Sequence, residues 1–165
     1  MDIKKQLKEY LDSYLNIKPI RKAKMMEKGF AGAMDFACCA EASINTFIND
    51  NKDEDTFQTK LFKYIDDRNL KDSDVYNKVN IDRRLFSKIR SNKDYHPSKE
   101  TIILFGLALE LKENEIVDLL ESASYSLPMN TTFDLIIRFC FKEGIYDINK
   151  VNEFLYDYKC KLLSE

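Results

Sequence analysis

The side chains best suited to bind a ligand lie between residues 83 and 93, in the segment RRLFSKIRSNK. A helix turning about 100° per residue would place its cations and hydroxyls along one side and its apolar residues along the other. Such a helix fits the major groove of DNA, where arginine pairs with guanine edges while lysine and serine hold phosphates. The candidate nucleic-acid-binding residues are Arg83, Arg84, Ser87, Lys88, Ser91 and Lys93.

The charge of the chain supports such binding only locally. Over its 165 residues the formal net charge is −2, which gives no overall attraction to nucleic acid. Residues 57–100 carry 11 Lys and Arg against 7 Asp and Glu, a net of +4, whereas residues 101–165 carry 6 against 11, a net of −5. The basic segment therefore coincides with the candidate binding helix, and an acidic segment follows it.

Residues typical of enzymes and metal sites form no recognisable pattern. The four cysteines are Cys38, Cys39, Cys140 and Cys160, and the single histidine is His96. Their spacing matches no usual set of zinc ligands, and the sequence has no Gly-rich phosphate loop. We therefore expect reduced thiols, no bound metal or cofactor, and no catalytic residues.

The sequence also lacks the signals that direct a chain to or across a membrane. Its first residues, MDIKKQLKEY, have no apolar core of a signal peptide. The most apolar stretch, ETIILFGLALEL, is shorter than the roughly 20 residues of a membrane-spanning helix. These features predict a cytoplasmic protein of a bacterium or a phage.

The spacing of apolar residues and the scarcity of proline and glycine predict an all-α protein. Asp72 or Ser73 can cap one helix, Asp82 the next, and Asp147 the last. The helix that Ser98 opens is apolar nearly all round, so it should be the central buried one. The expected helices cover residues 2–15, 33–49, 57–68 and 133–142 (capped by Thr131 or Thr132), with others from Asp72 to Val79, Asp82 to Ser91, Pro97 to Leu111, Asn114 to Leu127, and after Asp147.

The segment VYNKVNIDRRLFSKIRSN, residues 75–92, resembles the turn of the phage-repressor helix-turn-helix family, often called Xre or Cro-like. In that family the segment looks like LAxxLGVSxxTISRIExG, and the two align without a gap. Ser87 and Lys88 match its Ser-Arg pair. Asn80 stands at its turn glycine, which is compatible because asparagine tolerates the left-handed conformation. The family's apolar positions are filled by Val75, Val79, Ile81, Phe86 and Ile89.

This resemblance extends over residues 57–120 and implies a five-helix repressor-like helix-turn-helix bundle, with extra N-terminal and C-terminal helices in this chain. It implies that Arg83, Arg84, Ser87 and Lys88 face the groove and that two copies form a homodimer, as repressors usually do. The expected organisation is a two-helix appendage over residues 1–50, a polar linker over 51–56, the bundle over 57–123, and a C-terminal extension packed on it over 124–165.

Five residues depart from the family pattern and keep a second interpretation open. Tyr76 replaces a small residue, and Leu85 stands where the family often has a small or polar one. Asp72, Asp74 and Asp82 would repel phosphate if they faced a duplex. The basic helix could therefore belong to a surface that binds a protein.

A longer resemblance covers residues 55–163, through NIDRRLFSKIRSNKDYHPSKET, FDLIIRFCF and YDINKVNEFL. It is to a little-characterised bacterial domain at the C-terminal ends of multidomain proteins, and it implies an accessory docking or sensing role. The sequence thus leaves two functions: a non-enzymatic regulator that binds duplex DNA, or a helix-turn-helix adaptor that binds a protein and no DNA. For the second, the candidate interface residues are Tyr76, Leu85, Tyr10 and Tyr14.

Overall fold

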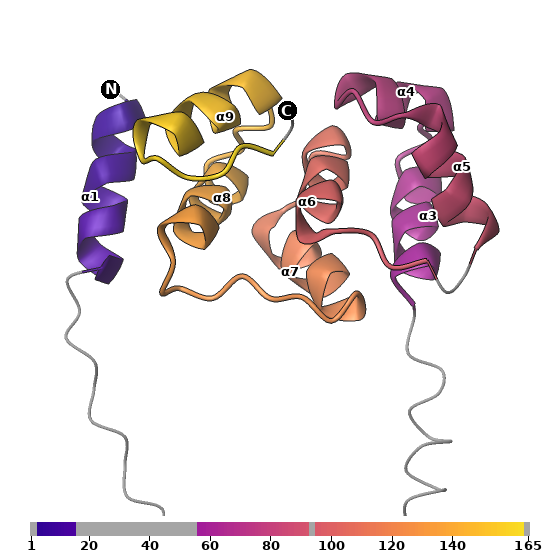
Figure 1. Ribbon diagram of the computed structural model, residues 1–165, viewed down its shortest axis with the longest axis horizontal. Coiled ribbons are helices and arrows are strands. Elements are labelled where there is room, and N and C mark those ends of the chain that lie inside the picture. The colour runs from indigo at the N-terminus through magenta and orange to yellow at the C-terminus, as the bar shows by residue number, and fades with distance from the viewer. Residues whose placement is uncertain (1–2, 16–55, 93–94, 164–165) are drawn as a thin grey trace, which may run out of the picture. The chain divides into compact units, whose positions relative to one another are not determined.

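The fold is known from a computed structural model, which describes residues 3–15, 56–92 and 95–163. These residues form α-helices and no strand, so the predicted all-α class is confirmed (Figure 1). The predicted helix over residues 33–49, most of the predicted linker, and Lys93 lie outside the described residues. The helices are α1 (Ile3–Leu15), α3 (Phe57–Asp67), α4 (Asp72–Lys78), α5 (Arg83–Ser91), α6 (Lys99–Ala108), α7 (Glu113–Ser122), α8 (Thr132–Lys142) and α9 (Ile148–Asp157).

Side-chain caps fix several helix starts where the sequence predicts them. The hydroxyl of Ser98 accepts a hydrogen bond from the backbone N–H of Thr101 at 3.2 Å, and Thr131 caps α8 in the same way. The carboxylates of Asp82 and Asp147 accept from N–H groups in the first turns of α5 and α9. Each cap satisfies a backbone donor that would otherwise have no partner within the helix.

Three predicted helix boundaries are wrong. The helix α4 begins at Asp72 after Lys71, and no side chain caps it; the Asp72 carboxylate instead accepts a hydrogen bond from Arg90 at 3.0 Å. The helix α6 ends at Ala108 and does not continue to Leu111. Glu110 takes a left-handed φ of 52°, and the chain turns away while Leu111 stays fully buried, so the apolar pattern outlasts the helix. The helix α7 ends at Ser122 and does not continue to Leu127, and Ser124 just after it takes a left-handed φ of 59°.

The core is centred on α6, as the sequence predicts. Every residue from 102 to 108 is buried, and Figure 1 draws α6 and α7 between the α3–α5 group and α8. Gly106 is required at the closest approach, because a Cβ there would lie 2.5 Å from Cδ1 of Ile116 and 3.0 Å from Cζ of Phe141. The absence of a side chain thus lets α6, α7 and α8 pack together.

The first helix packs on the C-terminal part of the chain. Leu7 and Leu11 of α1 are each 1% exposed, and α1 contacts α8. Lys4 pairs with Glu153 and Asp157 of α9 at 2.6 and 3.0 Å. All described residues belong to one compact unit. None of the described helices combines the length and apolarity needed to cross a membrane.

Candidate functional site

The turn between α4 and α5 has the conformation that the sequence suggests. Asn80 adopts a left-handed φ of 53°, as expected for the residue that replaces a turn glycine. The N–H of Ile81 donates to the carbonyl of Tyr76 at 2.9 Å, which closes the end of α4. Val79 and Ile81 are buried on either side of Asn80. The turn is therefore anchored in the core, and it sets the direction in which α5 leaves α4.

An aromatic cluster fixes the inner side of α5. Phe86 is 3% exposed, and its ring centroid lies 5.9, 5.6 and 5.8 Å from those of Phe62, Tyr76 and Phe105 respectively. These partners come from α3, α4 and α6. Because aromatic contacts of this kind hold both distance and orientation, α5 is seated on three helices, and its opposite side faces outward.

The C-terminal end of α5 is held by side chains from α3 and α4. The amide nitrogen of Gln58 donates to the carbonyls of Ile89 and Arg90 at 3.0 and 2.5 Å. The guanidinium of Arg90 bonds Asp72 and lies 4.4 Å from the ring centroid of Phe62. Arg90 thus serves the packing of α5 against its neighbours. The sequence gives no local signal for the role of Gln58, since its partners are 31 and 32 residues away.

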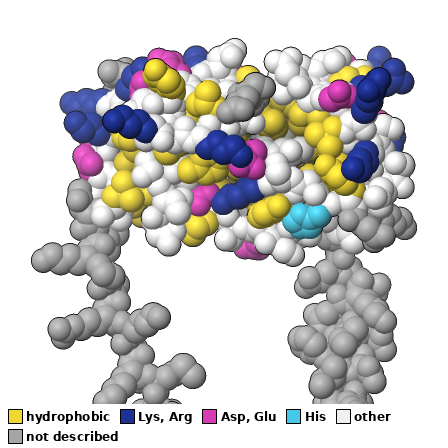
Figure 2. Space-filling model, in the orientation of Figure 1, with side chains coloured by type: hydrophobic (Ala, Val, Ile, Leu, Met, Phe, Trp, Pro, Cys, Tyr) yellow, Lys and Arg dark blue, Asp and Glu magenta, His cyan; other side chains and the backbone are white. Residues whose placement is uncertain are grey.

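The outer side of α5 carries the candidate nucleic-acid-binding residues together. Arg83, Arg84, Ser87, Lys88 and Ser91 are all exposed and line one shallow hollow. Figure 2 shows Lys and Arg side chains at the edge where Figure 1 places α4 and α5. Within the described parts of the chain, neither Arg83 nor Arg84 makes a side-chain hydrogen bond or ion pair. The ammonium of Lys88 lies 4.5 Å from the ring centroid of Tyr95.

The three aspartates near the outer side of α5 cap a helix, pair with an arginine, or line a different pocket. Asp82 accepts from the N–H of Arg84 at 2.6 Å, where the positive end of the α5 dipole offsets its charge. Asp72 is paired with Arg90. Asp74 lines a separate pocket beside the end of α6. None of the three is among the residues that line the hollow on the outer side of α5.

The candidate protein-interface residues fall in two places. Tyr76 on α4 and Leu85 on α5 are half-buried, and Tyr76 also lines a hollow between α4 and α5. Tyr10 and Tyr14 are half-buried on α1, with ring centroids 4.8 Å apart. The Tyr10 ring also packs against that of Phe139 of α8, with ring centroids 5.3 Å apart and ring planes tilted by 50°. The two tyrosines of α1 thus take part in the packing between α1 and α8.

Cys140 and His96 lie in environments that point to a role in packing and not in chemistry. Burial raises the pKa of the Cys140 thiol to about 12, so the nucleophilic thiolate is scarce at neutral pH. Nε2 of His96 lies 2.7 Å from the carbonyl of Ala123, and its ring packs beside Tyr125. Among the described residues, no group of three or more His, Cys, Asp or Glu side chains is placed to hold a metal ion.

Among the described residues, the outer side of α5 brings exposed cations and hydroxyls together, and there the side chains of Arg83 and Arg84 have no hydrogen-bonding or ionic partner. This side of α5 can bind anionic groups such as phosphates through Arg83, Arg84 and Lys88, with Ser87 and Ser91 as further hydrogen-bonding groups. Comparison of the chain with protein-family models, curated proteins and solved structures finds no match.

Proposed function

We propose that the chain is a non-enzymatic regulatory protein that binds duplex DNA through the outer side of α5. The observation that carries the proposal is the state of Arg83 and Arg84. Both are exposed, and among the described residues neither has a hydrogen-bonding or ionic partner for its side chain. An arginine with five free donors can pair with a guanine edge or a phosphate without first breaking an internal contact.

The setting of α5 supports the same proposal. An α-helix with its side chains is about 10–12 Å wide and the major groove about 12 Å, so α5 fits lengthwise. The aromatic cluster around Phe86 holds the helix from behind. Asp72 and Asp82 are occupied by Arg90 and by the start of α5, which reduces the repulsion that these carboxylates would otherwise exert on phosphate.

The resemblance to phage repressors adds to the proposal. The left-handed Asn80 between α4 and α5 suits a helix-turn-helix, and we propose that α3–α7 form the five-helix repressor-like bundle. A single module of this size makes few contacts with DNA. We therefore expect specific binding to involve two copies on two half-sites about one helical turn apart.

The experiment compares the parent chain with R83A/R84A and with K5A/K8A, which removes the same charge from exposed positions on α1. Fluorescence anisotropy with a labelled mixed-sequence duplex measures affinity at about 50 mM and about 200 mM salt. We expect R83A/R84A to lose at least about 30-fold in affinity, because each arginine contact contributes roughly 1–3 kcal/mol. The slope of log K against log salt should fall by about two.

Equal binding by R83A/R84A and the parent would overturn the proposal. So would an equal loss in K5A/K8A, because that result would indicate a general attraction of the charged chain and not a site on α5. Circular dichroism should give the same melting temperature for all three proteins, since the four substituted side chains are exposed. The comparison therefore separates loss of the site from loss of the fold.

A protein-binding adaptor is the second candidate. It is favoured by the half-exposed Tyr76 and Leu85, which add apolar surface beside the cations. This function predicts no duplex affinity above background at either salt concentration, and a partner whose binding is weakened by L85A. A strong, salt-sensitive affinity for the duplex that L85A leaves unchanged would count against it.

A further inference from the structure

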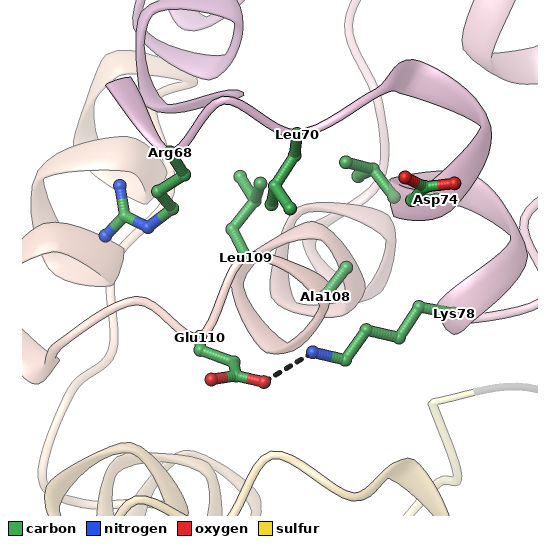
Figure 3. A pocket seen from close by; sticks show the side chains of 8 residues that line it. Arg68, Leu70, Asp74, Lys78, Ala108, Leu109 and Glu110 are labelled. Carbon is green, nitrogen blue, oxygen red and sulfur yellow. Dashed lines mark hydrogen bonds and ion pairs between the residues drawn. The ribbon is translucent and has the colours of Figure 1, made fainter. Parts of the chain in front are cut away.

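A pocket of about 370 Å³ lies where α4 meets the C-terminal end of α6. Its apolar lining comes from Leu70 before α4, Val75 on α4, and Ala108 and Leu109 at the end of α6. Leu70 is the exposed member, with 37% of its surface accessible. Figure 3 shows Leu70 and Leu109 facing one another above Ala108. A pocket of this size and lining suits a small apolar group.

Charged side chains surround this apolar lining. Figure 3 shows Lys78 of α4 reaching across to Glu110, and their Nζ and Oε1 atoms are 2.6 Å apart. Arg68 also lines the pocket, but its guanidinium is bonded to Glu115 at 2.9 Å. Both cations at the pocket are therefore already paired with carboxylates.

Asp74 is the acidic residue at the pocket that has no cationic partner within the described residues. Its carboxylate accepts a hydrogen bond from the hydroxyl of Ser73 at 3.2 Å. Counting Arg68 and Lys78 against Asp74, Glu110 and Glu115 gives two positive and three negative charges, a net of −1. An exposed carboxylate beside an apolar surface attracts a group that is both apolar and cationic.

We propose that this pocket binds a small molecule with an apolar body and one positive charge, such as a primary amine. The apolar body lies on Leu70 and Leu109, and the ammonium group donates a hydrogen bond to the Asp74 carboxylate. A neutral analogue keeps only the apolar contact, and an anionic analogue meets the unpaired carboxylate. This site is separate from the outer side of α5 and does not depend on DNA binding.

The test is an NMR titration of the full-length, ¹⁵N-labelled chain with three molecules of the same aromatic body: phenethylamine, phenylethanol and phenylacetate. Because small fragments make few contacts, each titration extends to millimolar ligand concentrations. We expect the amine to shift the amide resonances of Leu70, Asp74 and Leu109. Its affinity should exceed that of the alcohol by about threefold to fivefold, the upper part of the range of an exposed ion pair, and phenylacetate should bind most weakly.

Two variants and a control locate the effect. D74N should bind amine and alcohol equally, whereas E121Q, which removes an exposed carboxylate of α7 away from the pocket, should keep the preference for the amine. L70S should weaken both molecules alike. The proposal fails if the parent chain does not prefer the amine, if D74N retains that preference, or if the shifted resonances lie outside the pocket.

Discussion

The helices α5 and α6 are adjacent and similar in length, but they differ in how much of each is buried. They meet where the rings of Phe86 and Phe105 pack at 5.8 Å. Seven consecutive residues of α6 are buried, whereas α5 buries only Phe86 and Ile89. In α6, therefore, nearly every side chain is fixed by packing, while the polar side of α5 contributes little to the core.

This difference separates what stabilises the molecule from what is available for binding. A change in α6 must alter the free energy of unfolding, because the interior is close-packed and adjusts poorly to altered volume. A change on the outer side of α5 should leave that free energy nearly unchanged, because exposed substitutions usually alter it by less than about 0.5 kcal/mol. A loss of binding on substitution of Arg83 or Arg84 can then be attributed to the binding surface and not to partial unfolding.

The largest expected effect is the loss of stability in F105A. Phe105 is fully buried, and its removal should lower the free energy of unfolding by about 3–5 kcal/mol. L85A, in the half-buried position on α5, should cost less than about 1.5 kcal/mol, because fewer of its contacts are lost. Urea unfolding followed by circular dichroism measures both values.

Equal destabilisation by L85A and F105A would contradict the proposed difference between α5 and α6. Leu85 would then be part of the core and could not belong to a free surface beside α5. F105L provides a control, because it retains an apolar side chain of moderate volume and should fall between the parent and F105A. A graded series would show that packing sets the stability at this position.

Much of the fold follows from local sequence patterns. Ser98, Asp82 and Asp147 cap helices as expected because the cap needs only a short polar side chain followed by helical residues. The apolar character of residues 102–108 correctly indicates the central helix. The end of α6 does not follow from local patterns, because Leu111 continues the apolar pattern in a turn that the left-handed Glu110 has already begun.

The arrangement around α5 was predictable only in part. Helical periodicity alone places Arg83, Ser87 and Lys88 on one side, and the structure has them there. The bonds from Gln58 to the end of α5 and from Arg90 to Asp72 join residues that are distant in sequence. The pocket between α4 and α6 is likewise lined by residues that are distant in sequence. Contacts of this kind depend on how helices pack, which no local pattern specifies.

A smaller effect is expected at the turn that joins α4 to α5. Asn80 has a left-handed φ of 53°, which costs other L-residues roughly 1–2 kcal/mol and glycine almost nothing. N80A should therefore be less stable than the parent by about 1 kcal/mol, while N80G should be close to it. N77A, inside α4, should be neutral or slightly stabilising because alanine is a better helix former. Thermal melting distinguishes the three, and equal melting temperatures for N80A and N80G would contradict the role assigned to the turn.

The smallest expected effect concerns an ion pair at the start of α6. The Lys161 ammonium donates to the Glu100 carboxylate at 3.0 Å, and this hydrogen bond is the main reason that the pKa of Glu100 lies below its ordinary value of 4.5. Because the folded pKa is the lower one, the pair stabilises the fold above about pH 4.5, and the contribution is lost as the pH falls through the folded pKa. Lys161 is 71% exposed, so solvent screening should limit this contribution to about 0.5 kcal/mol.

K161A should raise the pKa of Glu100 towards 4.5, which NMR titration of the Glu100 side chain measures directly. K150A, which removes an exposed lysine of α9, should leave that pKa unchanged. If K161A left it unchanged as well, the hydrogen bond would not be its cause. A clear change in the pKa of Glu100 with little loss of stability would show that this ion pair, like the exposed side chains of α5, contributes little to the free energy of unfolding. Even next to the buried helix, exposed charges would then alter electrostatics and binding far more than they alter the fold.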